Sequence, residues 1–334
     1  MAKSFGRTSS SKAAARTERV DLYKQITERI IAQLEAGSVP WVQPWGDGPG
    51  TAGVAMPRNG VTARAYSGIN VLLLWQAAID NGFQVQRWLT FRQAIGLGGC
   101  VRRGEQGTPV VYADRFTPDD ERKRAERDGD EARQVAFLKR FTVFNVAQCD
   151  GLPEELTAPP APPRQDLIEP RFRALMANSG AKIIFGGSMA FYRPADDVIV
   201  MPPPEAFHEP VNVHRTLAHE MSHWSGAETR LNRLMKTTHG SACYAREELV
   251  AEISAAYVCA ALGIVPTVRH ADYLATWLEV LREDDRAIVR AASQASKAAD
   301  FLLAFLPDEE GGTDAAEGED SDACTDSAEP RRAA

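Results

Sequence analysis

The feature that most constrains this 334-residue chain is the stretch TLAHEMSHWSG, Thr216 to Gly226, which contains the pattern HExxH. On a helix, residues i and i+4 lie one turn apart on the same face, so His219 and His223 can reach one metal ion. Glu220 lies beside them, about 100° around the helix axis. Zinc hydrolases use two neutral imidazoles as ligands and a nearby carboxylate that takes a proton from bound water. The pattern therefore predicts a metal centre, and the alternative is a buried HExxH that binds no metal.

A third protein ligand is needed, because a catalytic zinc site holds three protein ligands and leaves the fourth position to water. The run YAREELVAEISAAYVCAALG predicts a long helix that offers Glu247, Glu248 and Glu252. Glu248 and Glu252 share an otherwise apolar face of this helix. An unpaired carboxylate is costly to bury, and a cation removes that cost. In the alternative interpretation both glutamates lie at exposed first turns of the helix and bind nothing.

The chain is predicted to fold as two α+β domains joined by the stiff, proline-rich run LPEELTAPPAPPRQ. The expected organisation is a disordered basic arm (1–18), a front domain (19–152) with a charged, mobile insertion at about 117–135, a linker (153–165), a back domain (166–306) and a disordered acidic tail (307–334).

Hydrophobic periodicity predicts the elements of both domains. In the front domain these are an amphipathic helix (22–34), a Gly/Pro/Trp loop, a buried helix (67–82), a short helix capped by Thr90 (90–98) and strands at 108–114 and 137–146. In the back domain they are a helix (170–179), strands at 181–186, 189–194 and 197–203 with a hairpin turn at 194–197, and helices at 211–224, 244–262 and 271–305.

The front half combines positive charge with aromatic residues. Residues 1–150 carry a net charge of +5 and residues 151–334 carry −12. Aromatic rings among cations suit single-stranded nucleic acid, because bases stack on the rings while the cations follow the phosphates. The candidate DNA-binding residues are Trp41, Trp45, Arg58, Arg64, Tyr66, Arg92, Arg102 and Arg103. The alternative is structural: the loop tryptophans fix their loop to the core, Trp75 and Trp88 are core residues, and the Arg102–Arg103 pair is a solvated turn.

Composition excludes several other classes. With 44% hydrophobic and 25% charged residues the chain has the composition of a globular protein, and no stretch has the roughly 18 apolar residues needed to cross a bilayer. The basic N-terminus lacks the apolar core of a secretory signal. Five cysteines form no CxxC pair, which favours reduced thiols and a cytoplasmic location. No membrane partner is expected, and the oligomeric state is left open.

HExxH with a glutamate on the next long helix resembles the gluzincin class of zinc peptidases. In that class an acidic residue four positions after the ligand glutamate orients a histidine, which implies Glu248 as ligand and Glu252 as its supporting partner. Many gluzincins have aspartate where this chain has Glu252, so the swapped assignment stays open. The resemblance further implies one Zn²⁺ per chain, or another divalent transition metal, with Glu220 as general base. It also implies strand 197–203 as an edge strand that pairs with an extended peptide. The sequence does not identify the oxyanion partner: His239 or Tyr244 could serve, and each of these residue types is more often structural.

About four fifths of the chain resembles ArdC-type antirestriction proteins, and the charged insertion after Phe116 and the acidic tail lie outside the resemblance. The resemblance rests on the ordered features DLYKQITERIIAQLEAGSVPWVQPW, PRNGVTARAYSGINVLLLW, FRQAIGLGGCVRRGEQGTPVVY and FTVFNVAQCDGL, and on the back-half run LAHEMSHWSGAETRLNR. The front part, about 20–152, also resembles the N-terminal region of plasmid TraC-type primases. The resemblance implies a plasmid or mobile-element protein that binds single-stranded DNA and protects incoming DNA from host restriction.

Two further hypotheses compete with this one. In the first, the chain is a zinc endopeptidase that cleaves a host protein, such as a restriction enzyme subunit, and its front domain recognises that protein. In the second, the acidic tail imitates DNA and occupies the groove of a restriction enzyme.

Overall fold

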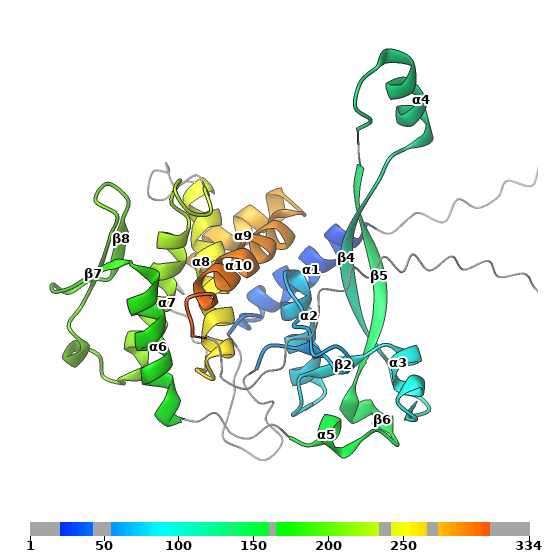
Figure 1. Ribbon diagram of the computed structural model, residues 1–334, viewed down its shortest axis with the longest axis horizontal. Coiled ribbons are helices and arrows are strands. Elements are labelled where there is room, and N and C mark those ends of the chain that lie inside the picture. The colour runs from blue at the N-terminus through cyan, green and yellow to red at the C-terminus, as the bar shows by residue number, and fades with distance from the viewer. Residues whose placement is uncertain are drawn as a thin grey trace, which may run out of the picture.

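The computed structural model describes residues 21–42, 55–133, 135–159, 165–233, 242–265 and 273–307. The predicted arm, the tail beyond 307 and part of the predicted linker lie outside these ranges. Within the predicted linker the structure has a short helix, α5 (Glu154–Thr157), which the proline-rich composition does not predict. The described part of the chain combines helices with small, mainly antiparallel sheets and ends in four consecutive helices, so the predicted α+β class is confirmed (Figure 1).

The front half is built on a four-stranded sheet. Its order is β1 (Arg58–Asn59), β2 (Arg87–Leu89), β5 (Val135–Asn145) and β4 (Thr108–Phe116), and β3 (Cys100–Val101) pairs separately with β6 (Cys149–Asp150). The expected helices are present as α1 (Leu22–Glu35), α2 (Ile69–Asp80) and α3 (Phe91–Gly96). Thr90 caps α3 through a capping box with Gln93, as predicted for its N-terminus.

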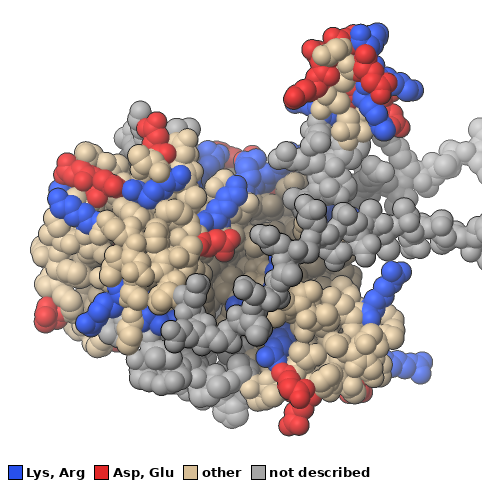
Figure 2. Space-filling view, viewed as in Figure 1, with Lys and Arg blue, Asp and Glu red and all other residues tan. Residues whose placement is uncertain are grey.

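The charged insertion contains a helix where the sequence pattern predicts only a mobile segment. Strands β4 and β5 pair from Thr108–Val143 to Phe116–Val135, and α4 (Asp119–Asp128) lies at the far end of this long hairpin (Figure 1). Its first turn carries three acidic residues, which the helix dipole favours, and Gly129 ends it in a left-handed conformation. The helix presents both charge signs and projects away from the body of the molecule (Figure 2).

The back half opens with α6 (Gln165–Ser179) and a three-stranded sheet. Strand β9 (Val198–Met201) lies between β7 (Lys182–Phe185), to which it is parallel, and β8 (Phe191–Arg193), to which it is antiparallel. The expectation that residues 197–203 form an edge strand is therefore wrong. The tight turn at 194–197 places β8 on one side of β9, and β7 pairs on the other, so β8 is an edge strand.

The remaining helices form a bundle. They are α7 (Val211–Ser225), α8 (Ala242–Ala261), α9 (Leu274–Glu283) and α10 (Ala287–Leu303). The periodicity predicts a single helix over 271–305, but the chain breaks at Asp284, which is extended (φ −144°, ψ 102°). The Asp284 carboxylate accepts a hydrogen bond from the backbone N–H of Arg286 in the turn between the two helices, and α10 begins after Arg286, its N-cap residue.

One hydrophobic core joins the two halves. It combines residues of α1 and α2 with residues of α7, α8, α9 and α10. Trp41 is completely buried and packs edge-on against Trp277 of α9, with ring centroids 5.5 Å apart. Trp75 packs in the same way against Tyr257 of α8. Trp75 and Trp88 are core residues, as the structural interpretation of these tryptophans predicts.

Candidate metal centre

Helix α7 is buried on all sides over its second half. Every residue from Thr216 to Ser225 is buried, because α7 lies between the small sheet and helices α8 and α10. The hydroxyls of Thr216 and Ser222 donate to the carbonyls of Asn212 and Ala218, one turn earlier, so neither of these two hydroxyls is left without a partner. The helix can therefore hold the HExxH side chains away from bulk water.

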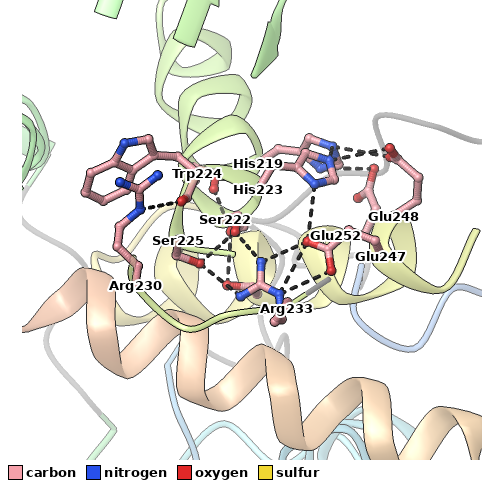
Figure 3. A network of polar contacts seen from close by, with 12 residues as sticks. His219, Ser222, His223, Trp224, Ser225, Arg230, Arg233, Glu247, Glu248 and Glu252 are labelled. Carbon is pink, nitrogen blue, oxygen red and sulfur yellow. Dashed lines mark hydrogen bonds and ion pairs between the residues drawn. The ribbon is translucent and has the colours of Figure 1, made fainter. Parts of the chain in front are cut away.

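His219, His223 and Glu248 converge on one point (Figure 3). His219 Nε2 lies 3.5 Å from Glu248 Oε2, His223 Nε2 lies 3.4 Å from Glu248 Oε1, and the two Nε2 atoms are 3.2 Å apart. Three atoms that each lie about 2.1 Å from one ion, at tetrahedral angles, are about 3.4 Å apart. The spacing of these donor atoms therefore fits a first-row divalent metal ion.

Each imidazole also has a carboxylate near its other nitrogen. Glu252 Oε1 lies 3.7 Å from His219 Nδ1, and Glu247 Oε1 lies 3.5 Å from His223 Nδ1. Glu247 in turn forms a buried ion pair with Arg233, at 2.8 Å (Figure 3). Carboxylates in this position orient ligand histidines and fix their tautomers. The role of Arg233 is not predicted from the sequence, because this residue lies in the loop after α7, outside the HExxH pattern.

The electrostatics of the cluster require a positive charge between its side chains. Burial alone lowers the pKa of His223, but its hydrogen bonds with Glu247 and Glu248 outweigh burial and raise the pKa to about 10. Burial alone raises the pKa of Glu248, but hydrogen bonds with His219 and His223 hold it well below its usual range. A proton on the imidazole supplies the charge in one state, and a divalent cation with two neutral imidazoles supplies it in another.

A cavity of about 240 Å³ opens onto the cluster. Glu220, Tyr244 and Tyr273 also line it. Tyr244 is hydrogen-bonded with Glu248 and Tyr273. The segment from Ala190 through Tyr192, which includes the first two residues of edge strand β8, also borders the cavity. A strand edge beside a metal cluster can hold an extended peptide.

An arginine fixes this edge strand to the helix of the metal cluster. Arg230 donates to the Trp224 carbonyl at the end of α7 (2.6 Å), and its guanidinium lies 4.0 Å from the Trp224 ring centroid. The same guanidinium pairs with Asp197, which accepts a hydrogen bond from Tyr192. The hydrogen bond from Arg230 lowers the pKa of Asp197. Arg230 therefore positions the β8–β9 hairpin relative to the histidines.

The predicted DNA-binding residues do not form one group. Trp41 is buried against Trp277 and exposes no ring face, which corrects the expectation that it stacks on a base. Trp45 and His239 lie outside the described residues. Arg64 and Tyr66 border a cavity on the front half. The remaining candidate arginines are exposed and do not line that cavity: Arg58, Arg92, Arg102 and Arg103. The Arg58 guanidinium donates a hydrogen bond to the Ala63 carbonyl. Arg102 forms ion pairs with Glu105 and Asp150.

Comparisons with known protein families match both halves. Residues 20–144 match the N-terminal domain of the anti-restriction factor ArdC, and residues 170–294 match a zincin-like metallopeptidase family. The crystal structure of the antirestriction ArdC protein from the R388 plasmid is 39% identical, with a TM-score of 0.71 over 85% of this chain and 97% of the other. An Mn(II)-bound structure of the same protein has a TM-score of 0.69.

Comparison with full-length protein sequences also finds relatives of this chain. The chain is 40% identical over 295 residues to the uncharacterized protein y4eC of Sinorhizobium fredii, spanning 86% of this chain and 93% of that protein. It is 38% identical over 298 residues to the DNA primase TraC of Escherichia coli, covering 85% of this chain but only 27% of the primase. No helix in the described part of the chain combines the length and apolar character that crossing a membrane requires.

Proposed function

This chain belongs to the ArdC family of antirestriction proteins, and from that membership we propose that it binds single-stranded DNA with its front half and a divalent metal ion with its back half. By this activity it protects plasmid DNA that enters a cell from host restriction. The observation that carries the proposal is the match to an antirestriction protein over 85% of this chain and 97% of the other. The related N-terminal region of a DNA primase supports a nucleic-acid role for the front half.

The metal ligands in this proposal are His219, His223 and Glu248, with Glu252 supporting His219. Zn²⁺ is the first choice for two imidazoles and one carboxylate, and Mn²⁺ is the ion in the related R388 structure. When bound, the ion supplies a Lewis acid that polarises a carbonyl and acidifies water. Glu220 borders the same cavity and would accept a proton from water there, and the hydrogen bond with Tyr244 orients Glu248.

The DNA part of the proposal is tested by titrating the full chain against fluorescent single- and double-stranded oligonucleotides at several salt concentrations. We expect tighter binding to the single strand. The logarithm of its affinity should fall linearly with the logarithm of salt, with a slope of about −0.7 per phosphate contacted. Absence of binding at low salt would remove DNA from the proposal and leave the protein-recognition alternative.

The alternative function is a zinc endopeptidase that destroys a host protein, and it is favoured by the edge strand beside the metal cavity. Glu220→Gln tests it, because the change removes the proton acceptor and keeps the volume. If DNA binding is sufficient, the variant still protects unmodified plasmid DNA transferred into a restricting host. Loss of protection, with metal content and single-strand binding unchanged, would favour proteolysis instead.

A further inference from the structure

A second cavity lies on the front half, separate from the metal centre. It has a volume of about 310 Å³ and shares no lining residue with the metal cavity. Its walls come from the segment between β1 and α2, the first turn of α2, the residue before α3, and strands β4 and β5. Val110 and Val143, which are buried, are among the residues that line it. A cavity of this size is at the small end of ligand sites and suits one flat ring system.

Two exposed aromatic side chains border this cavity. Tyr112 is 66% exposed and Phe141 is 42% exposed. In the β4–β5 register, Phe141 is opposite Val110 and Tyr112 is opposite Lys139, so the two aromatic residues are diagonal neighbours on one face of the hairpin. Large apolar side chains exposed beside a cavity are typical of a binding site. Two rings at this spacing offer faces on which flat ligands can stack.

The charge around this cavity is positive. Arg64 is exposed and lines it, and the described lining contains no carboxylate. Lys139 Nζ lies 5.3 Å from the centroid of the Phe141 ring. The turn before Arg64 is fixed, because Asn59 Oδ1 accepts hydrogen bonds from the backbone N–H groups of Val61 and Thr62. An arginine beside exposed aromatic rings suits an anionic ligand that carries flat groups.

The exposed edge of β4 is not free to pair with a peptide at this point. The Asn70 side chain donates to the Val111 carbonyl at 2.7 Å and accepts from the Val111 N–H at 2.8 Å. It therefore occupies both backbone groups that an added strand would need. The cavity must recognise its ligand through side-chain rings and charge instead.

We propose that this cavity is a nucleobase pocket for single-stranded DNA, in which Tyr112 and Phe141 stack on bases and Arg64 and Lys139 contact phosphates. The proposal rests on the single-strand binding proposed above and assigns it a surface. A duplex does not fit this surface, since its bases are stacked on each other and present no free faces. None of the residues of this pocket belongs to the metal centre.

The test uses the full chain and a fluorescent oligothymidylate. Tyr112→Ala combined with Phe141→Ala should weaken binding about tenfold or more at constant salt, because two stacking surfaces are lost. Arg64→Gln should reduce the salt slope by about 0.7, the value of one phosphate contact on a single strand. The aromatic exchange Tyr112→Phe with Phe141→Tyr should retain binding. Phe185→Ala is the matched control, since Phe185 on β7 is also 42% exposed but lies in the back half.

The possible results separate the two proposals. If the wild-type chain binds no single strand at any salt, the proposed DNA function and this pocket both fail. If the wild type binds and the double alanine variant binds equally well, the pocket is wrong and the DNA function stands. An equal loss in the Phe185→Ala control would also overturn the pocket, because the effect would not depend on position. Thermal melts of each variant, together with the aromatic exchange, separate lost stacking from lost folding.

Discussion

Three neighbouring carboxylates of α8 face different nitrogens, and this difference predicts different effects on metal affinity. Glu248 faces Nε2 of both histidines, whereas Glu252 faces only Nδ1 of His219. We expect Glu248→Gln to lower Zn²⁺ and Mn²⁺ affinity by more than about 100-fold, because it removes an anionic ligand. Glu252→Gln should cost about 10- to 100-fold, the usual effect of a partner that orients a ligand. Calorimetric titration of the metal-free protein with each ion measures both.

The control for this comparison is Glu279→Gln, a change on α9 away from the metal cluster that should leave affinity unaltered. A larger loss from Glu252→Gln than from Glu248→Gln would reverse the ligand assignment. Glu247→Gln adds a second check, since this residue reaches His223 and Arg233 and should behave like Glu252.

The same residues show how far sequence alone reaches. HExxH is a local pattern whose geometry follows from one helical turn, so the sequence by itself places His219, Glu220 and His223 together. Glu248 and Glu252 share a face of the same helix, and only the packing of α7 against α8 distinguishes them. The stacking role expected for Trp41 is wrong, because Trp41 packs on Trp277 instead. The local sequence around a loop tryptophan is the same whether its ring stacks on a base or packs in the core, so the sequence does not distinguish the two.

At the level of elements, periodic patterns predict most helices and strands, and non-local pairing causes the main error in the sheets. Strand β9 lies between β7 and β8 because it pairs with both of them. The hydrophobic pattern of a strand does not indicate its pairing partners. Helix α4, which was not predicted, does have local signals, with acidic residues at its start and Gly129 at its end. The break between α9 and α10 has weaker local signals, because the turn from Asp284 to Arg286 contains neither proline nor glycine.

At the scale of the whole molecule, aromatic contacts run from the front half to the metal centre. Trp41 contacts Trp277, Trp277 stacks on Tyr273, and Tyr273 packs on Tyr244, which is hydrogen-bonded with Glu248. Further links support the junction: Thr27 donates to the Asp285 carbonyl, and Tyr257 donates to the Gly68 carbonyl. Trp41 therefore contributes to the support of the metal site, although it lies about 180 residues earlier in the chain.

This shared core predicts that the front half does not fold alone. Helix α1 packs against α9 and α10, so a fragment ending at residue 165 would expose Ile26, Ile30, Leu34 and Trp41 to water. We expect no cooperative thermal transition for this fragment and one for the full chain, measured by circular dichroism and calorimetry. In the full chain Trp41→Ala should lower the free energy of unfolding by about 3–5 kcal/mol, as for a buried aromatic residue. A fragment that melts cooperatively near the full-chain temperature would show instead that the front half is stable without α9 and α10, and that the buried Trp41–Trp277 contact is dispensable for its fold.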